Sequence, residues 1–428
     1  MGKITAIALC DCNRFYVACE RAAVPGIWDR PVIVLSNNDG SIVSISEEAE
    51  AVGLAKGMPY FRVRETVKEH KVRVFSSNYT LYGSLSKRVM DTLRTLSPGI
   101  EIYSIDEAFL DLSHIDADRL DAHARHIRRV VKRWTGVGIS IGIAETKTLA
   151  KVANRLAKKT PALEGVMDLT GNRVLQEAAL TKLPVGDVWG IGSRWEKALA
   201  QDAGVTNALQ LRDLSDLWVK KRMGVVGMRT VLELRGLPCL PLQTAAPRRK
   251  SACVSRSFGR PVCDRQGLSE AVASFAARAA RKLRKEHLAA GSMAVFASSS
   301  RFGDDPVSVS ARCALDTASN VTPVLLGHAR ELVDALWREG VPFAKAGVLL
   351  ADLCDENEIQ LSLFDPGFDP KNQQPARLMS VIDGMNRELG RGSVRFAAEG
   401  TEQPWRTRAA FLSPRWTTQW NDLPIVHA

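Results

Sequence analysis

The chain has 428 residues, which is long for a single domain, so we expect about two to four domains. Its hydrophobic fraction of 45% and charged fraction of 25% are those of a soluble globular protein, and its longest apolar runs are strand-sized, which excludes a membrane-spanning protein. The net charge of +11 favours a polyanionic partner.

The N-terminal residues MGKITAIALCD are typical of an opening strand rather than a signal peptide, because no cleavage site of small residues follows the apolar run. Eight scattered cysteines form no CxxC pair and have no cluster of histidines nearby, which argues against a zinc site and for free thiols in a reducing compartment. We therefore expect a cytoplasmic protein.

The first part of the chain mixes strands and helices, which predicts an α+β arrangement. NNDG at 37–40 is a turn signal that joins two short apolar runs into a hairpin. Ser46 is the expected N-cap of a helix that ends at Gly53. Strands are expected at 1–11, 31–35, 41–46, 100–112 and 137–144, and further helices at 13–20, 81–96, 122–134 and 146–159.

The rest of the chain divides into three regions. Residues 171–236 predict short helices, and LPLQTAAPRRK at 240–250 is typical of a linker. After Asp355 the chain is polar and rich in proline and glycine, so we expect a tail with little core of its own and one helix at 377–389. Between linker and tail lies a second α+β unit, with strands expected near 254–258, 293–299 and 346–352 and helices near 268–287 and 323–338.

Two adjacent carboxylates interrupt the apolar stretch YSIDEAFLDL at 103–112. Successive side chains of a strand point to opposite faces, so Asp106 and Glu107 can converge only at a hairpin tip or a bulge. Asp11 ends the first predicted strand and can lie at the same sheet edge. Oxygen ligands without His or Cys suit Mg²⁺, and a pair of such ions supports an in-line phosphoryl displacement. The alternative is a turn with solvated acids, which the flanking apolar residues disfavour.

Basic residues gather in two stretches. From Arg248 to Lys285 there are eleven Lys or Arg and two acids, and from Arg128 to Lys159 there are nine and one. A solvated helix face usually carries both signs of charge, so this one-sided distribution favours a surface that follows phosphates.

Several motifs together resemble one family. DCNRFYVACE at 11–20 and SIDE at 104–107 resemble the paired motifs of the Y-family, the translesion DNA polymerases. Within that family, the chain is similar to the UmuC-type catalytic subunit of bacterial DNA polymerase V, and the resemblance covers nearly the whole chain. The segments that carry this closer resemblance are SNNDG at 36–40, FSSNYTLYG at 75–83, GIAETKTLAKVAN at 142–154, DVWGIG at 187–192 and the tail from Arg391 to Thr418.

The resemblance implies a multidomain right-hand polymerase of α+β class with an added α+β little-finger domain and a C-terminal tail. The implied activity is error-prone, template-directed DNA synthesis past damaged bases, in the DNA damage (SOS) response. The implied domains are a palm at 1–20 and 79–170, fingers at 21–78, a helical thumb with a helix-hairpin-helix at 171–239, a linker at 240–252, a little finger at 253–355 and a tail with a clamp-binding motif at 356–428.

The resemblance also implies a catalytic centre for nucleotidyl transfer from a dNTP to a primer 3′-hydroxyl. Asp11, Asp106 and Glu107 would bind two Mg²⁺ ions. The backbone carbonyl of Cys12 would complete the second metal site.

A second implied group of residues would bind the nucleotide. Phe15 and Tyr16 begin a helix whose amides would cradle phosphates. Tyr16 matches the steric gate, whose ring leaves no room for a 2′-hydroxyl, although core packing is the alternative for both rings. Ser44 and Lys158 match contacts to the triphosphate.

The chain departs from the family pattern in the helix after Ser46. Two positions there usually carry phosphate contacts, often a Tyr and then an Arg or Lys, but this chain has Glu47 and Glu50. Acids close to a triphosphate repel it. Either the helix is shifted, or nucleotide binding is weaker and depends on Lys158 and metal.

Residues outside the catalytic centre would hold the DNA. Gly190 and Gly192 lie in a segment that resembles a helix-hairpin-helix, where glycines let backbone amides approach a phosphate, although a plain tight turn is the alternative. Five basic residues would grip the duplex backbone without reading its sequence: Arg248, Arg249, Lys250, Arg256 and Arg278.

QLSLF at 360–364 resembles the short motif by which bacterial polymerases bind the sliding clamp (beta). Leu361, Leu363 and Phe364 would be apolar anchors and Gln360 a hydrogen-bonding residue, while a short strand docked on its own domain is the alternative. Beyond primer–template DNA and dNTP, the resemblance implies a UmuD′-type dimer and a RecA-type recombinase filament as partners, a nucleoid-associated location and no membrane.

Two rival functions stay open at this point. A catalytically impaired homologue could bind DNA and clamp as a scaffold or inhibitor, which Glu47 and Glu50 favour and the complete set of three acids disfavours. A two-metal nuclease fits the acids but neither the thumb nor the steric gate.

Overall fold

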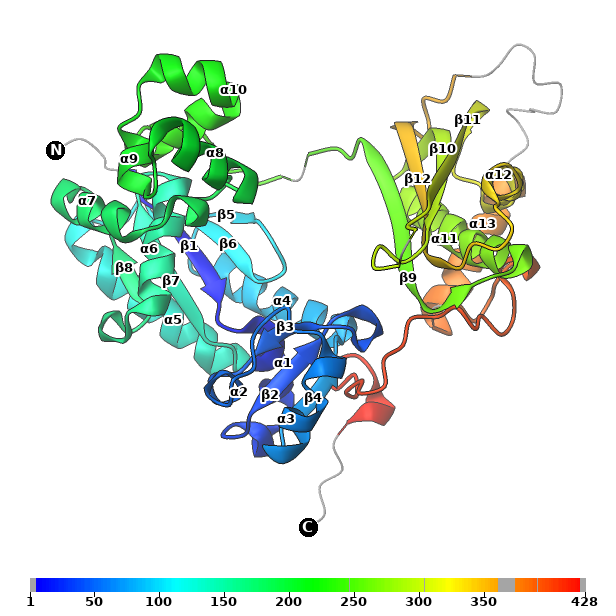
Figure 1. Ribbon diagram of the computed structural model, residues 1–428, viewed down its shortest axis with the longest axis horizontal. Helices are drawn as coiled ribbons and strands as arrows, with labels where there is room; N and C mark the ends of the chain where they lie inside the picture. Colours follow the sequence, from blue (N-terminus) through cyan, green and yellow to red (C-terminus); the bar gives the residue numbers. More distant parts are fainter. Residues whose placement is uncertain (1–4, 246, 304, 361–373, 391, 424–428) are drawn as a thin grey trace. The chain divides into compact units, whose positions relative to one another are not determined.

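The computed structural model describes residues 5–245, 247–303, 305–360, 374–390 and 392–423 (Figure 1). The chain forms two compact units. The first comprises Met1–Ser36, Gly40–Ala246 and Phe411–Ala428, and the second comprises Asn37–Asp39 and Pro247–Ala410. The chain therefore leaves the first unit after Ala246 and returns to it at Phe411.

A five-stranded sheet forms the centre of the first unit, in the order β5-β6-β1-β7-β8. The middle strand β1 is antiparallel to β6 and β7, while β7 and β8 are parallel. Its side chains alternate between two cores, because Ala8 and Cys10 pack toward α4 and α5 and Leu9 packs toward α6. The strands are β1 Ile7–Cys12, β5 Gly99–Ile102, β6 Glu107–Asp111, β7 Ile139–Ala144 and β8 Val166–Asp168.

The three helices against this sheet follow from their apolar spacing and caps. In α5 (Leu120–Thr135), Leu120, Ala124, Ile127 and Val131 are buried, which is one stripe of a helix with a basic opposite face. Thr146 caps α6 (Lys147–Lys159) by accepting a bond of 3.2 Å from the amide of Leu149. The third helix is α4 (Tyr79–Arg94).

A smaller sheet in the same unit has the order β3-β2-β4. The hairpin predicted around residues 37–40 is confirmed, since β2 (Val32–Leu35) and β3 (Ile42–Ile45) are antiparallel. β4 (Arg73–Ser76) pairs with β2 in parallel, a strand that the sequence did not predict. The helices of this region are α1 (Phe15–Ala23), α2 (Glu47–Ala51), which Ser46 caps, and α3 (Arg64–Glu69).

Four helices follow, as predicted for residues 171–236: α7 (Arg173–Lys182), α8 (Ser193–Ala203), α9 (Ala208–Arg212) and α10 (Asp216–Leu234). Glu233, which is fully buried, anchors them to α6. Its carboxylate accepts bonds of 3.0 and 3.1 Å from the amide and hydroxyl of Thr148, in the first turn of α6. It also accepts bonds from the amides of Cys239 and Leu240, so one carboxylate fixes the end of α10.

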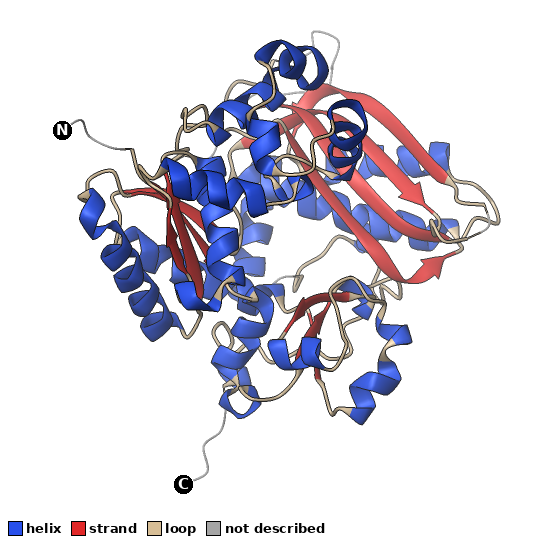
Figure 2. Ribbon diagram, turned by 60° about the vertical axis from the view of Figure 1, so that its left-hand side comes forward, coloured by secondary structure: helices blue, strands red, loops and turns tan. Residues whose placement is uncertain are grey.

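The second unit is a four-stranded antiparallel sheet in the order β11-β10-β12-β9, with α11 and α12 packed on one face (Figure 2). Its strands are β9 (Ser251–Val262), β10 (Leu288–Ser298), β11 (Ser308–Ser319) and β12 (Phe343–Asp355), and its helices are α11 (Arg265–Lys285) and α12 (Thr322–Leu336). The sequence analysis did not identify β11, although Val309, Ala311, Cys313 and Leu315 recur at every second position along it and pack toward the core.

The residues after Asp355 contribute more to the folded core than predicted. The expected helix is present as α13 (Gln374–Glu388), and its Asp383 forms an ion pair of 2.7 Å with Arg284 of α11. Trp405 is 4% exposed and lies in the core of the second unit. These segments, predicted to have little core of their own, therefore pack on the second unit and add Trp405 to its core.

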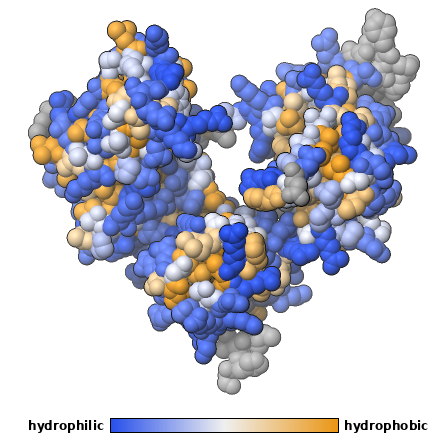
Figure 3. All heavy atoms as spheres, viewed as in Figure 1, coloured by the Kyte–Doolittle hydropathy of each residue, from blue (hydrophilic) through white to orange (hydrophobic). Residues whose placement is uncertain are grey.

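Figure 3 shows hydrophilic side chains over much of both units, with apolar side chains in small separate groups. Within the described residues, no helix is long and apolar enough to cross a membrane.

Candidate active site

The stretch YSIDEAFLDL is a hairpin rather than the single strand predicted for 100–112. β5 and β6 are antiparallel, and residues 103–106 turn between them. The hydroxyl of Ser104 holds the turn by accepting bonds of 3.1 and 3.0 Å from the amides of Asp106 and Glu107, and it donates a bond of 2.6 Å to the Asp106 carboxylate. The two acids therefore stand at a hairpin tip, which is one of the two arrangements that the sequence allowed.

Asp11 lies directly opposite Glu107, because the two residues are partners in the β1–β6 register. The amide of Cys12 donates a bond of 2.8 Å to the carbonyl of Asp106, which brings the third predicted acid to the same end of β1. In the described parts of the chain, no three His, Cys, Asp or Glu side chains lie close enough together to hold a metal ion. Asp11 and Glu107 interact, whereas the Asp106 carboxylate bonds to Ser104.

Two lysines of α6 neutralise the facing carboxylates. Lys158 forms an ion pair with Asp11, and the Lys151 ammonium lies 3.0 Å from a Glu107 oxygen. Burial raises the pKa of the Asp11 carboxyl to about 7, against the opposing effect of Lys158. Buried acids that need nearby cations fit a site for divalent metal, and a set of oxygen ligands without His or Cys fits a hard ion.

Lys151 was missed by the sequence reasoning. Its ammonium lies over three aromatic rings, at 4.7 Å from the centre of Tyr103, 5.3 Å from Trp189 and 5.8 Å from Phe109. Its spacing of seven residues from Lys158 places both on one face of α6, and that spacing was the available signal.

The two predicted nucleotide-binding rings differ in their surroundings. Phe15 is 4% exposed and packs in the core, as the alternative interpretation allowed. Tyr16 is half-buried and stacks on Tyr82 with ring centres 4.5 Å apart, while Tyr79 meets it edge-on at 6.1 Å. Burial raises the pKa of the Tyr16 hydroxyl, so this ring stays neutral.

Ser44 is 4% exposed, and its hydroxyl bonds to the backbone of α1. It lies 3.4 Å from the amide of Val17, from which it accepts, and 3.5 Å from the carbonyl of Arg14, to which it donates. Ser44 therefore supports the first turn of α1 in this structure.

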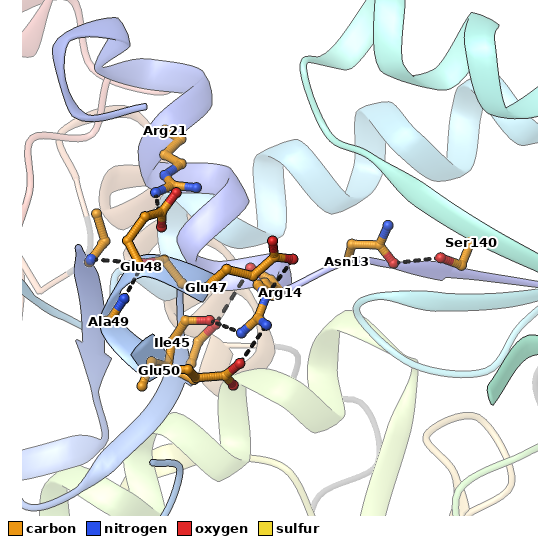
Figure 4. Close-up of polar contacts among 12 residues, drawn as sticks. Asn13, Arg14, Arg21, Ile45, Glu47, Glu48, Ala49, Glu50 and Ser140 are labelled. Carbon is orange, nitrogen blue, oxygen red and sulfur yellow. Dashed lines mark hydrogen bonds and ion pairs between the residues drawn. The ribbon is translucent and has the colours of Figure 1, made fainter. Parts of the chain in front are cut away.

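Glu47 and Glu50 hold an arginine between them (Figure 4). Arg14 stands at the N-cap of α1 with φ 49°, a left-handed conformation. Its guanidinium lies 2.6 Å from a Glu50 oxygen and 3.5 Å from a Glu47 oxygen, and it donates a bond of 2.7 Å to the carbonyl of Ile45. The bond from Arg14 lowers the pKa of Glu50. The positive charge that α2 lacks is thus supplied from α1.

The predicted DNA-binding residues lie in both units. Gly190 has φ +89°, which favours glycine in this tight turn, and Gly192 caps α8. Arg248 pairs with Asp355 at 3.3 Å and Arg249 with Glu286 at 2.7 Å, so two of the five basic residues already have acidic partners.

The other three basic residues differ in exposure. Lys250 and Arg256 are exposed, whereas Arg278 is half-buried, and burial together with nearby Arg256 lowers its pKa. In the predicted clamp motif, Gln360 is exposed, while Leu361, Leu363 and Phe364 lie outside the described residues.

Comparison with known protein families gives three matches along the chain. Residues 10–155 match the impB/mucB/samB family, residues 249–363 match the impB/mucB/samB family C-terminal domain, and residues 376–426 match a domain of unknown function (DUF4113). The first match contains the facing acids and lysines, except Lys158.

Similar proteins match over nearly the full chain. Protein UmuC of Salmonella typhimurium (strain LT2) is 43% identical over 420 residues, which cover 97% of this chain and 99% of that protein. Protein MucB of Escherichia coli is 41% identical over 98% of this chain and 99% of its own. DNA polymerase IV 2 of Halalkalibacterium halodurans is 26% identical over 93% of this chain and 95% of its own. The chain therefore belongs to the impB/mucB/samB family, the UmuC-type Y-family DNA polymerases of translesion synthesis.

Proposed function

We propose that the chain extends a DNA primer past damaged bases by nucleotidyl transfer from a dNTP, at a site built on Asp11, Asp106 and Glu107. The observation that carries this proposal is the pairing of Asp11 with Glu107 across β1 and β6, with Lys158 and Lys151 beside them. Facing carboxylates next to lysine ammonium groups suit a reaction in which negative charge must be bound and released.

The domains follow from this assignment. The five-stranded sheet would be the palm, at 1–20 and 79–170, and the three-stranded sheet would be the fingers, at 21–78. Helices α7 to α10 would be the thumb, with the turn at Gly190 as its helix-hairpin-helix, and the second unit would contain the little finger.

The family uses divalent metal, and we propose two Mg²⁺ ions. Asp11, Asp106, Glu107 and the carbonyl of Cys12 would hold them. When bound, the metal lowers the pKa of the primer hydroxyl and binds the triphosphate. Lys158 pairs with Asp11 in this structure. Lys158 would contact the triphosphate from this position beside Asp11.

The residues of α1 would select and bind the nucleotide. Tyr16 would be the steric gate, with its ring held by the stacked Tyr82. Arg14 would supply the cation expected on α2. Glu47 and Glu50 fix its guanidinium, and Arg14 follows Asp11 closely in the sequence. Ser44 would act by supporting the amides of α1.

Other parts of the chain would bind partners. The glycines at 190 and 192 and the basic residues from Arg248 to Arg278 would hold DNA through its phosphates, and 360–364 would bind the sliding clamp. A UmuD′-type dimer, a recombinase filament, induction in the SOS response and a nucleoid-associated location remain part of the proposal on the strength of family resemblance.

Primer extension tests the activity. The chain is assayed with Mg²⁺ and dNTPs on damaged and intact templates, alone and with the clamp and the two protein partners. We expect extension by the wild type and its loss in Asp106→Ala. Absence of extension under every condition, or equal extension by Asp106→Ala, would refute the polymerase assignment.

We prefer the polymerase to the scaffold function. Glu47 and Glu50 favoured the scaffold because a basic residue was expected in that helix, and both acids contact the basic Arg14. The three catalytic carboxylates are all present at one end of β1.

A further inference from the structure

The segment from Phe411 to Trp416 attaches to the first unit next to the proposed nucleotide site. Phe411 exchanges two bonds with Ser76 of β4, at 2.9 Å from the Ser76 amide to the Phe411 carbonyl and at 3.0 Å from the Phe411 amide to the Ser76 hydroxyl. Leu412 forms a parallel bridge with Ser76, and Trp416 packs against the core of the first unit. The segment thus adds to the edge of the small sheet.

Asn78 connects this segment to the first turn of α4. Its side-chain oxygen caps α4 by accepting a bond of 3.2 Å from the amide of Leu81. Its side-chain nitrogen donates to the carbonyl of Ser413 at 2.9 Å, to the Ser413 hydroxyl at 3.1 Å and to the carbonyl of Pro414 at 3.3 Å. Asn78 and Ser413 are 3% and 6% exposed, so these bonds form away from water, where they fix geometry.

Ser413 also reaches α1 through Glu20. The Ser413 hydroxyl donates a bond of 2.9 Å to one oxygen of Glu20, and the Tyr82 hydroxyl donates a bond of 2.7 Å to the same oxygen. Glu20 and Tyr82 are both fully buried. One carboxylate oxygen therefore joins α1, α4 and a segment 393 residues away in the chain.

The Tyr82 ring fixed in this way is the ring behind Tyr16. The two rings are stacked at 4.5 Å with an angle of 15° between their planes. A ring that excludes a 2′-hydroxyl must resist displacement, because a steric contact discriminates only while its support is rigid. The position of Tyr16 therefore depends on Tyr82, and that of Tyr82 on Glu20 and Ser413.

We propose that Phe411–Trp416 is a strap that holds the first turn of α4 against α1, and that Ser413, Glu20 and Tyr82 are positioning residues for sugar selection by Tyr16. This assigns a role to the last part of the domain of unknown function, which matches residues 376–426. The proposal rests on the proposed function, since it requires Tyr16 to be the gate.

The test compares kcat/KM for a dNTP with kcat/KM for the matching ribonucleotide in primer extension by the full chain with its partners. Ser413→Ala removes one bond to Glu20 and one from Asn78, and we expect the dNTP preference to fall about fivefold, the equivalent of one hydrogen bond. Tyr82→Phe keeps the stacked ring but loses its bond to Glu20, and we expect a similar fall in the dNTP preference. Tyr16→Ala should lower the preference further, and adding Ser413→Ala to Tyr16→Ala should cause no additional loss of preference.

Thr92→Ala is the matched control, because Thr92 is a buried hydroxyl on the same helix that bonds only within α4, to the carbonyl of Arg88. It should keep the wild-type preference. A second readout needs no catalysis: hydrogen exchange at the Leu81 amide should quicken in Ser413→Ala and not in Thr92→Ala.

The outcomes separate the strap from the gate. If Tyr16→Ala lowers the dNTP preference while folded Ser413→Ala and Tyr82→Phe keep it, the gate stands and the strap is refuted. If Tyr16→Ala itself keeps the preference, the gate assignment fails and the strap proposal falls with it. Unchanged exchange at Leu81 in Ser413→Ala would also overturn the strap.

Discussion

Glu20→Gln should remove a pH-dependent loss of stability from the first unit. Burial raises the pKa of Glu20 from 4.5 to about 7, although the bonds from Tyr82 and Ser413 oppose this change. Below pH 4.5 the carboxyl is protonated in both the folded and the unfolded chain. As the pH rises toward 7, only the unfolded chain ionises, so the free energy of unfolding falls. At 1.36 kcal/mol for each pKa unit, the full loss is about 3 kcal/mol.

Glutamine keeps the oxygen that receives both hydroxyl bonds but cannot ionise. Its amide replaces the second Glu20 oxygen, which is buried without a hydrogen-bond partner in the described structure, so Glu20→Gln should carry a constant cost of about 1–3 kcal/mol at every pH. The informative quantity is therefore the difference in unfolding free energy between variant and wild type. It should rise in favour of the variant by about 2.5 kcal/mol between pH 5 and pH 8 and level off above the folded pKa.

Urea unfolding, followed by tryptophan fluorescence at several pH values, measures this difference. Ser413→Ala serves as the matched control in the opposite direction. It removes the hydroxyl whose bond lowers the Glu20 pKa, so the free energy of unfolding should depend more steeply on pH than in the wild type. A difference between Glu20→Gln and wild type that does not change with pH, or that grows as the pH falls, would refute a neutral buried carboxyl at this position.

Three further outcomes are expected. Arg14→Ala removes the guanidinium that lies between Glu47 and Glu50 and should raise the KM for dNTP severalfold, whereas an unchanged KM would exclude Arg14 from the triphosphate site. Glu233→Ala leaves four donors without their partner, two of them buried, and should cost at least about 3 kcal/mol of unfolding free energy, measured by urea titration. Arg256→Ala should weaken DNA binding and lower its salt slope by about one, and equal binding across salt concentrations would contradict the proposed phosphate contact.

Local patterns predicted much of the fold. Helix α6 begins at its Thr146 cap, α5 follows its apolar stripe, and β2 and β3 pair around NNDG. These features depend on neighbouring residues, which a sequence displays directly. The break in YSIDEAFLDL was also predictable, because adjacent acids cannot both lie on the buried face of one strand.

The errors fall where distant residues decide the structure. The contact of Glu47 and Glu50 with Arg14 was not predicted, because Arg14 is more than thirty residues away in the chain. The contacts of the tail with the first unit were not predicted either, because Ser413 meets Asn78 and Glu20 only in the folded protein. No local pattern encodes such pairs.

Three lysines of α6 form ion pairs with three acids, one on each of three neighbouring strands, and the order of the lysines along α6 follows the order of the strands in the sheet. Lys147 pairs with Glu101 of β5, Lys151 with Glu107 of β6, and Lys158 with Asp11 of β1, and these strands are neighbours. The spacing of four and seven residues keeps all three lysines on one helix face.

Because of this arrangement, alanine substitutions at the three candidate metal ligands should differ in how much stability they remove. Asp11 and Glu107 each balance a partly buried lysine, so replacing either with alanine leaves an unpaired charge and destabilises the first unit as well as the site. Asp106 forms no ion pair within the described residues and bonds through its side chain to Ser104 alone. Asp106→Ala should therefore abolish extension with a smaller loss of stability than Asp11→Ala, and comparing the two by thermal melting distinguishes a catalytic defect from a folding defect.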